Sequence, residues 1–300
     1  MSIDSTWLRC PNCFLDLSPV DDRTFGCETG HRFDRSKHGF LTLLPPKAPR
    51  TVGDDPGMLR ARAGLLGSGA YTPISDALIE AVRSVSDSPQ TRAAGESGSP
   101  LRVADLGCGT GHYSAELARA LPELGFLLAD RSPDAVRASL RALPAATGVV
   151  LDIWRPLPLR TDCVDVILNV FAPRNLDEFA RVLRPGGTLL TVVPTERHLR
   201  ELRRDGLMLD IPSGKSSGLT EQLSALGFAT DSITAIEYPL QADATTRLLL
   251  ADMGPSAHHA ETLAQDATAG STGAEATVPV TVSIELLRFT LAAGGDVWHA

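Results

Sequence analysis

The run Leu101-Arg-Val-Ala-Asp-Leu-Gly-Cys-Gly-Thr-Gly-His112 decides the fold of this chain. Its apolar first half is typical of a buried strand, and the apolar residues of 112–121 have helical spacing. Between them, Gly107, Gly109 and Gly111 permit positive backbone torsions and let a ligand approach the backbone closely. The run therefore predicts a strand, a glycine turn and a helix that hold a nucleotide-like cofactor.

The chain after this run continues to alternate between strand-like and helix-like segments. Apolar runs predict further strands at 126–130, 149–152, 165–170, 188–193 and 278–288, with a helix at 176–183 and a turn at 184–187. This alternation favours an α/β, Rossmann-like fold, in which helices cover both faces of a parallel sheet. The strands end in Asp105, Asp130, Asp152 and Asn169. We expect these side chains to converge at the ligand-binding edge of the sheet.

The spacing of the glycines and acids alone fits NAD as well as S-adenosylmethionine. An acid opens the turn, however, and the core Asp-Leu-Gly-Cys-Gly-Thr-Gly resembles motif I of S-adenosylmethionine methyltransferases more than a dinucleotide fingerprint. We expect Asp105 to receive the methionine amine, Asp130 to hold the ribose hydroxyls, and Asp152 to lie with Ile153 beside the adenine. The full set of predicted cofactor-binding residues is Asp105, Gly107, Cys108, Gly109, Gly111, His112, Asp130, Asp152 and Ile153.

Near its start the chain carries Cys10, Cys13, Cys27 and His31 in two closely spaced pairs. Three thiolates and one imidazole form the ligand set of a closed, structural zinc site, which leaves no open position for catalysis. Buried free thiols or a disulfide are the alternative, but the paired spacing favours metal. We therefore predict a structural Zn²⁺ that folds this short segment.

Composition limits the function less than the motifs do. The net charge of −8 does not by itself indicate nucleic acid, although basic residues gather within 31–66 and 197–204, where solvated faces are the simpler explanation. We find no membrane-spanning run and no secretory leader, and metal-type cysteine spacing suits a reducing cytoplasm. Two polar stretches, 86–99 and 256–276, interrupt the pattern, and the sequence does not indicate their role.

Several longer blocks resemble one family, the 23S rRNA (guanine-N1)-methyltransferases of the RlmA and TlrB type. The resemblance extends from the cysteines to about Pro255, and it is carried by His31–Pro45, Met58–Arg62, Tyr71–Pro73, Asn169–Pro173 and Arg197–Leu202. It implies an N-terminal zinc-binding RNA-recognition module (1–45), a helical and flexible linker (46–99) and an S-adenosylmethionine-dependent methyltransferase domain (100–300). It also implies 23S rRNA as partner, no membrane association and a cytoplasmic location, and leaves a homodimer open.

The resemblance implies a reaction as well. The family methylates N1 of a guanine in the hairpin 35 loop of 23S rRNA, nucleotide 748 or its near neighbour 745, and some members confer resistance to tylosin-like macrolides. Asn169, Phe171 and Pro173 occupy the loop where many amino-methyltransferases orient the target nitrogen, and His198 lies near a strand end. We take these four as the candidate catalytic residues. The proton acceptor stays open among Asp152, Glu196, His198 and water.

A zinc-containing methyltransferase acting on a small molecule or a protein is the alternative function. In that case the zinc module would be a lid, and the arginines would be solvated surface.

Overall fold

A computed structural model describes residues 3–45, 53–87, 100–212, 214–253 and 277–293. The helices are the 3₁₀ turn η1 (Ser5–Trp7), α1 (Pro56–Gly67), α2 (Thr72–Ser86), α4 (His112–Ala120), α5 (Pro133–Ala142), α6 (Leu176–Val182), α7 (Arg200–Arg204), α8 (Lys215–Ala225) and α9 (Ala244–Asp252). The strands are β1 (Ser18–Pro19), β2 (Thr24–Gly26), β3 (Arg32–Asp34), β4 (Leu41–Thr42), β5 (Arg102–Leu106), β6 (Gly125–Asp130), β7 (Thr147–Val150), β8 (Val164–Val170), β9 (Leu183–Pro194), β10 (Phe228–Ala242) and β11 (Val278–Leu291).

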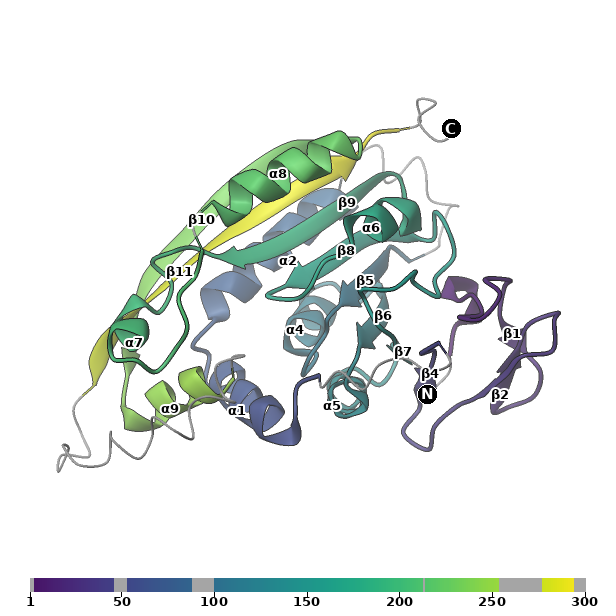
Figure 1. Cartoon of the computed structure of the whole chain (residues 1–300), viewed down its shortest axis with the longest axis horizontal. Coiled ribbons are helices and arrows are strands. Elements are labelled where there is room, and N and C mark those ends of the chain that lie inside the picture. Colours follow the sequence, from purple (N-terminus) through teal and green to yellow (C-terminus); the bar gives the residue numbers. More distant parts are fainter. Residues whose placement is uncertain (1–2, 46–52, 88–99, 213, 254–276, 294–300) are drawn as a thin grey trace.

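An eight-stranded sheet forms the centre of the molecule (Figure 1). Its order is β10-β11-β9-β8-β5-β6-β7-β4, with neighbours from β9 to β4 parallel and with β11 and β10 antiparallel. The order of the strands reverses between β5 and β8, and ligands bind in the crevice at such a point. The predicted α/β, Rossmann-like fold is therefore confirmed.

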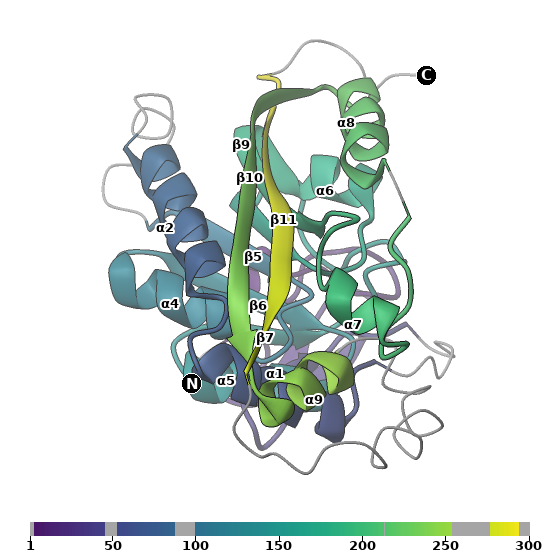
Figure 2. The same ribbon diagram turned by 90° about the vertical axis from the view of Figure 1, so that its left-hand side faces the viewer.

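Helices cover the sheet on both faces (Figure 2). On one face lie α2, α4 and α5, whose apolar residues join a core with alternate residues of the strands. In α2 the buried Ile74, Leu78, Val82 and Val85 follow helical spacing and give it one apolar side. On the other face, α6 and α8 share a second core with residues of the N-terminal module.

The N-terminal module has its own three-stranded sheet, β1-β2-β3, and then enters the large sheet. Its last strand, β4, pairs in parallel with β7, with Leu41 opposite Val149. Two backbone hydrogen bonds tie it further, from the Arg9 N–H to the Pro158 carbonyl and from the Arg160 N–H to the Trp7 carbonyl, both 2.9 Å. The module is thus anchored to the body of the protein.

Two local predictions were wrong in detail. The predicted turn at 184–187 lies inside β9, because pairing with β8 begins at Leu183, shifts in register, and resumes at Thr188. The third predicted strand does not reach Asp152, since β7 ends at Val150 and the chain then turns. Asp152 consequently lies in a loop and not at the end of a strand.

The polar segment 256–276 lies outside the described residues, as does 86–99 apart from its first two residues. Among the described helices, none is both long enough and apolar enough to span a membrane.

Candidate functional site

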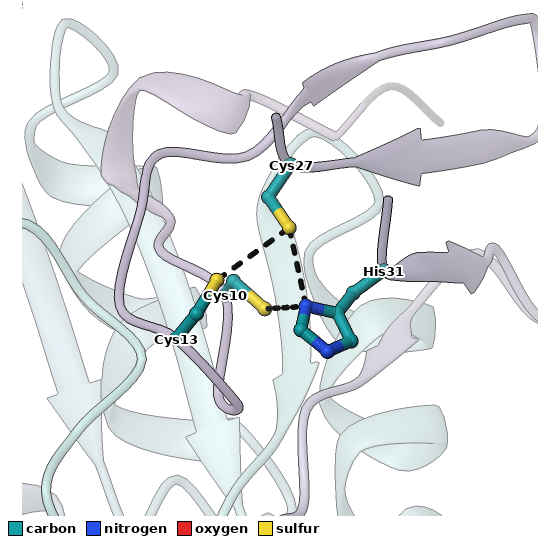
Figure 3. Close-up of side chains that lie close together, drawn as sticks. All are labelled: Cys10, Cys13, Cys27 and His31. Carbon is teal, nitrogen blue, oxygen red and sulfur yellow. Dashed lines mark hydrogen bonds between the residues drawn. The ribbon is translucent and has the colours of Figure 1, made fainter. Parts of the chain in front are cut away.

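The four predicted zinc ligands come together in the N-terminal module (Figure 3). Nδ1 of His31 lies 3.5 Å from Sγ of Cys10 and 3.4 Å from Sγ of Cys27, and the sulfurs of Cys13 and Cys27 are 3.6 Å apart. Ligand atoms around one tetrahedral Zn²⁺, at about 2.0–2.3 Å from it, are separated by about 3.5–3.8 Å. All five cysteines of the chain are free thiols. The side chains therefore fit a closed zinc site rather than a disulfide.

Two tight turns build this site. In the first, the Asn12 N–H donates to Sγ of Cys10 at 3.4 Å, which folds the knuckle around its own sulfur. In the second, Gly30 adopts a φ of +90° and its N–H donates to the Cys27 carbonyl at 3.0 Å. The glycine is needed because other side chains rarely adopt this torsion.

The structure adds Thr29, which was not predicted from the sequence. Its hydroxyl lies 3.1 Å from the sulfurs of Cys13 and Cys27 and from Nδ1 of His31. Groups that hydrogen-bond to metal ligands orient them and tune the affinity of the site. Thr29 is therefore positioned to orient the ligands of the zinc ion.

The glycine turn after β5 has the geometry expected of a cofactor cradle. Gly107, Gly109 and Gly111 have φ values of +98°, +51° and +74°. A Cβ on Gly107 would lie 2.4 Å from Cβ of Ala172, and one on Gly111 would lie 2.6 Å from Cβ of Ser139. Space as well as torsion thus excludes a side chain at these two positions.

Two acids flank the turn. Asp105 is buried and accepts a hydrogen bond from the Ser114 hydroxyl at 2.7 Å. Burial raises the pKa of Asp105 to about 7, opposed by that hydrogen bond and supported by the charge of Asp130. Asp130 accepts the N–H groups of Gly109 (3.0 Å) and Ser132 (2.9 Å), and burial raises its pKa. Neither acid forms an ion pair with a described residue, so each can accept hydrogen bonds from a ligand.

Asp152 and Ile153 lie in the loop after β7. This strand pairs with β6, which ends at Asp130. Asp152 forms an ion pair with Arg131 and accepts the Trp154 N–H at 3.1 Å. Ile153 is buried. The loop thus places the apolar side chain of Ile153 beside the ion-paired carboxylate of Asp152, an arrangement compatible with the predicted adenine site.

The side chains of the other two predicted cofactor-binding residues, Cys108 and His112, contact serines of neighbouring helices. Cys108 points into the core, with Sγ 3.5 Å from the Ser139 hydroxyl. His112 begins α4, and its Nε2 lies 3.4 Å from the Ser75 hydroxyl of α2. Burial lowers the pKa of His112, so its imidazole is neutral near pH 7.

Helix α1 brings a cation to the glycine turn that the sequence had not placed there. Nη1 of Arg62 would lie only 3.1 Å from a Cβ at Gly109. The same guanidinium pairs with Asp54 and donates to the Met253 carbonyl at 2.8 Å. Arg60, two residues earlier, is exposed. The structure therefore separates two arginines that the sequence grouped in one basic cluster.

Asn169 joins the end of β5 to the loop that follows β8. Its Nδ2 donates to the carbonyls of Leu106 (3.1 Å) and Pro173 (2.8 Å), and its Oδ1 accepts from the Thr191 hydroxyl at 3.3 Å. The side chain is fully buried, and both amide hydrogens are used. In this structure it shapes the loop.

Three rings from distant segments meet beside this loop. Phe171 stacks on His198, with ring centres 5.9 Å apart, and Tyr71 lies 6.2 Å from each. Phe171 has a φ of +52° and is 39% exposed, whereas the other two are buried. Strained backbone of this kind is concentrated at functional sites. Phe171 is thus presented at the surface on a rigid support.

His198 is held by both of its ring nitrogens. Nδ1 accepts the Ser283 N–H at 3.2 Å, and Nε2 lies 3.5 Å from the Tyr71 hydroxyl. Burial lowers the pKa of His198 to about 3, with a further contribution from Arg203, so the ring is neutral. Its contacts suit a support for Phe171 better than a proton acceptor. Of the other candidate acceptors, Asp152 is paired with Arg131 and Glu196 is exposed.

Two family models match the chain. One, described as a methyltransferase domain, covers residues 103–187, and the other, described as the N-terminal region of RlmA, covers 8–51 and includes the zinc ligands. The chain is thus an enzyme whose cofactors are S-adenosylmethionine and a structural zinc ion, as predicted.

Two individual relatives agree with these models. A protein of Streptomyces fradiae named 23S rRNA (guanine(748)-N(1))-methyltransferase is 40% identical over 84% of this chain and 86% of its own length. A protein of Micromonospora griseorubida, named as a candidate 23S rRNA (guanine-N(1)-)-methyltransferase, is 38% identical over 94% of this chain and 96% of its own length. The crystal structure of the YcgJ protein from Bacillus subtilis superposes with a TM-score of 0.45 at 17% identity, over 68% of this chain and 97% of that one.

The chain contains both the zinc-binding cluster and the glycine turn of a methyltransferase domain, and it is 38–40% identical to these two relatives over most of its length. This chain belongs to the 23S rRNA (guanine-N1)-methyltransferase family.

Proposed function

We propose that this enzyme transfers a methyl group from S-adenosylmethionine to N1 of a guanine in the hairpin 35 loop of 23S rRNA. Guanine 748 is the expected target, and its neighbour 745 is the alternative. The observation that carries the proposal is the 40% identity, over most of both chains, to the relative named for guanine 748. Resistance to tylosin-like macrolides would follow from methylation at that position.

Bound S-adenosylmethionine supplies a methyl group made electrophilic by the positive sulfur to which it is attached. In the proposed arrangement Asp105 receives the methionine amine, because it is a buried carboxylate beside the glycine turn. Asp130 holds the ribose hydroxyls, and Asp152 and Ile153 border the adenine. Gly107, Cys108, Gly109 and Gly111 bring the backbone to the cofactor, and His112 closes the cradle at the start of α4.

The target base is held by the loop after β8. We assign Phe171 the role of stacking on the unpaired guanine, since it is the exposed member of the aromatic trio. Unstacked bases of RNA loops are commonly held on aromatic rings. Asn169 and Pro173 set the shape of the loop through their mutual hydrogen bond, and His198 supports the ring of Phe171.

The zinc module (1–45) is assigned to RNA recognition, the segment 46–99 is assigned as a helical and flexible linker, and 100–300 is assigned to methyl transfer. Arginines contribute phosphate contacts that position RNA without selecting the base. An rRNA substrate supports the prediction of a cytoplasmic enzyme. A homodimer remains part of the proposal, and gel filtration with light scattering tests it.

Primer extension tests the function. 23S rRNA lacking the modification is incubated with the enzyme and S-adenosylmethionine, and methylation of N1 stops reverse transcriptase because it removes a Watson-Crick donor. We expect a new stop next to guanine 748. The variant Asp130→Ala serves as a control that loses cofactor affinity. A complete lack of stops, together with confirmed cofactor binding, would favour the small-molecule or protein methyltransferase instead.

A further inference from the structure

Arg174 is a partly buried cation that has no acidic partner among the residues that the structure describes. It directly follows Pro173 in the loop after β8, and its Nε donates to the Thr191 hydroxyl at 3.2 Å. Within the described residues it forms no ion pair, and burial is the cause that lowers its pKa. Removing a guanidinium from water is costly unless a partner compensates for it.

Two other shielded arginines in this protein do pair with acids. Arg131, with 17% of its side chain exposed, pairs with Asp152, and Arg181, with 25% exposed, pairs with Glu178. Arg102 is shielded and also has no described acid, but its guanidinium lies 3.9 Å from the centre of the Trp7 ring, whereas no ring is described over Arg174. Arg174 thus marks a position whose counter-charge arrives with a ligand.

Hydrogen bonds connect Arg174 to the cofactor turn. Thr191 receives the Arg174 Nε–H and donates its own proton to Asn169, which in turn donates to the carbonyl of Leu106 at the end of β5. The same loop packs on the turn through Ala172, close to Gly107. The guanidinium thus lies at the edge of the sheet to which the proposed function assigns the cofactor and the target base.

The chemistry of the target base indicates which negatively charged group could pair with Arg174. N1 of guanine carries a proton and is a poor nucleophile until that proton leaves. When N1 bonds to the methyl carbon, its proton passes to water, while the bond from carbon to sulfur breaks and its electron pair stays on sulfur. Negative charge that builds up on the base before the new bond is complete resides mainly on O6.

On the basis of the proposed function, we infer that Arg174 binds O6 of the target guanine and stabilises the negative charge that develops there during methyl transfer. Arginine reads O6 and N7 of guanine with two parallel N–H donors. Adenine presents an amino group at the same position and would meet the guanidinium as a second donor. Arg174 would accordingly favour guanine as well as promote the reaction.

Single-turnover methylation of the target RNA between pH 6 and pH 9.5 tests this inference. The variants are Arg174→Gln and Arg174→Lys. The matched control is Arg155→Gln, an exposed arginine in the loop after β7 whose carbonyl accepts a hydrogen bond from Asn175, the residue that follows Arg174. We expect the Gln variant to lose roughly 10²-fold or more in rate at pH 7, as for loss of one donor to a developing oxyanion. The loss should shrink as the pH rises, because free guanine itself ionises in alkaline solution. The Lys variant should recover part of the rate.

Two other results would overturn the inference. If Arg174 bound a phosphate, the Gln variant would bind RNA more weakly with a salt slope smaller by about one, and its rate with saturating RNA would be unchanged. If it were merely structural, the rate would fall by the same factor at every pH, and Arg174→Lys would not restore it. A wild-type enzyme that leaves guanine N1 unmethylated would refute the proposed function first, and this inference with it.

Discussion

The ring of Phe171 stacks on the ring of His198, with centroids 5.9 Å apart and planes inclined by 24°. One face of an exposed aromatic side chain is thereby fixed by a buried, neutral histidine. Because aromatic contacts of this kind contribute about 0.5–1.5 kcal/mol, the pair defines where Phe171 points.

Replacing His198 should therefore weaken the reaction through Phe171. For His198→Ala we expect kcat/KM for RNA to fall about tenfold, as for the loss of one such contact, with no change in cofactor affinity. His198→Phe keeps a ring and should lose less. Methylation kinetics measure kcat/KM for RNA, and calorimetry with S-adenosylmethionine measures cofactor affinity. An equal loss in both variants would show that the imidazole nitrogens matter, not the stacking.

His198 should also make the protein sensitive to acid. Its pKa is about 3 in the folded protein, whereas an unfolded histidine has a pKa of about 6.5. The unfolded state therefore binds a proton first, and stability should fall as the pH drops from about 6.5 towards 3, by at most about 1.4 kcal/mol per pH unit. Urea unfolding of the wild type and of His198→Phe at pH 7 and pH 5 measures this. The variant should lose less stability, since zinc release affects both proteins alike.

Cofactor affinity should depend on pH through Asp105. Its pKa is raised to about 7, and an amine binds best to the ionised carboxylate. Affinity for S-adenosylmethionine should thus increase as the pH rises through about 7 and then level off, with a limit of tenfold per pH unit below it. Calorimetry from pH 5.5 to 8 tests the slope. Asp105→Asn should bind weakly at every pH and show a flatter profile; a wild-type affinity with no slope would contradict the assignment to the amine.

Arg62 and Arg60 should differ although they share α1. Arg62→Gln removes a guanidinium that lies over Gly109 and holds Asp54 and the Met253 carbonyl, so cofactor affinity should drop about tenfold or more, as expected for a hydrogen-bonded charge. Arg60→Gln should leave cofactor affinity unchanged. Equal affinities in the two variants would mean that Arg62 does not contribute to the cofactor site.

Thr29 should tune the zinc site. Thr29→Val removes the hydroxyl that contacts three ligand atoms but retains the shape of the side chain. Zinc affinity should decrease by about 10–100-fold, in the range found for groups that orient metal ligands. Competition with a chromogenic chelator measures the affinity. Thr42→Val, at an exposed position of β4, is a control that should bind zinc normally.

Sequence patterns were sufficient where neighbours along the chain determine the structure. Gly107, Gly109 and Gly111 specify the turn because positive torsions there are a local requirement, and the run that precedes them forms a strand in any parallel sheet. Cys10, Cys13, Cys27 and His31 likewise specify their ligand set, since chemistry and spacing alone identify a zinc site. The resemblance of longer blocks added the family and its substrate.

Tertiary structure decided what depends on contacts across the sheet. Only the packing of α1 shows that Arg62 faces the glycine turn while Arg60 faces solvent. Only the pairing of β8 with β5 and β9 directs the Asn169 amide into the protein, and only burial against α2 and β11 makes His198 a neutral support. The physical reason is that burial, charge pairing and the direction of a side chain depend on groups that are far apart in the sequence, as Tyr71 and His198 are. Local sequence therefore fixes which groups are present, and the fold fixes what each of them can do.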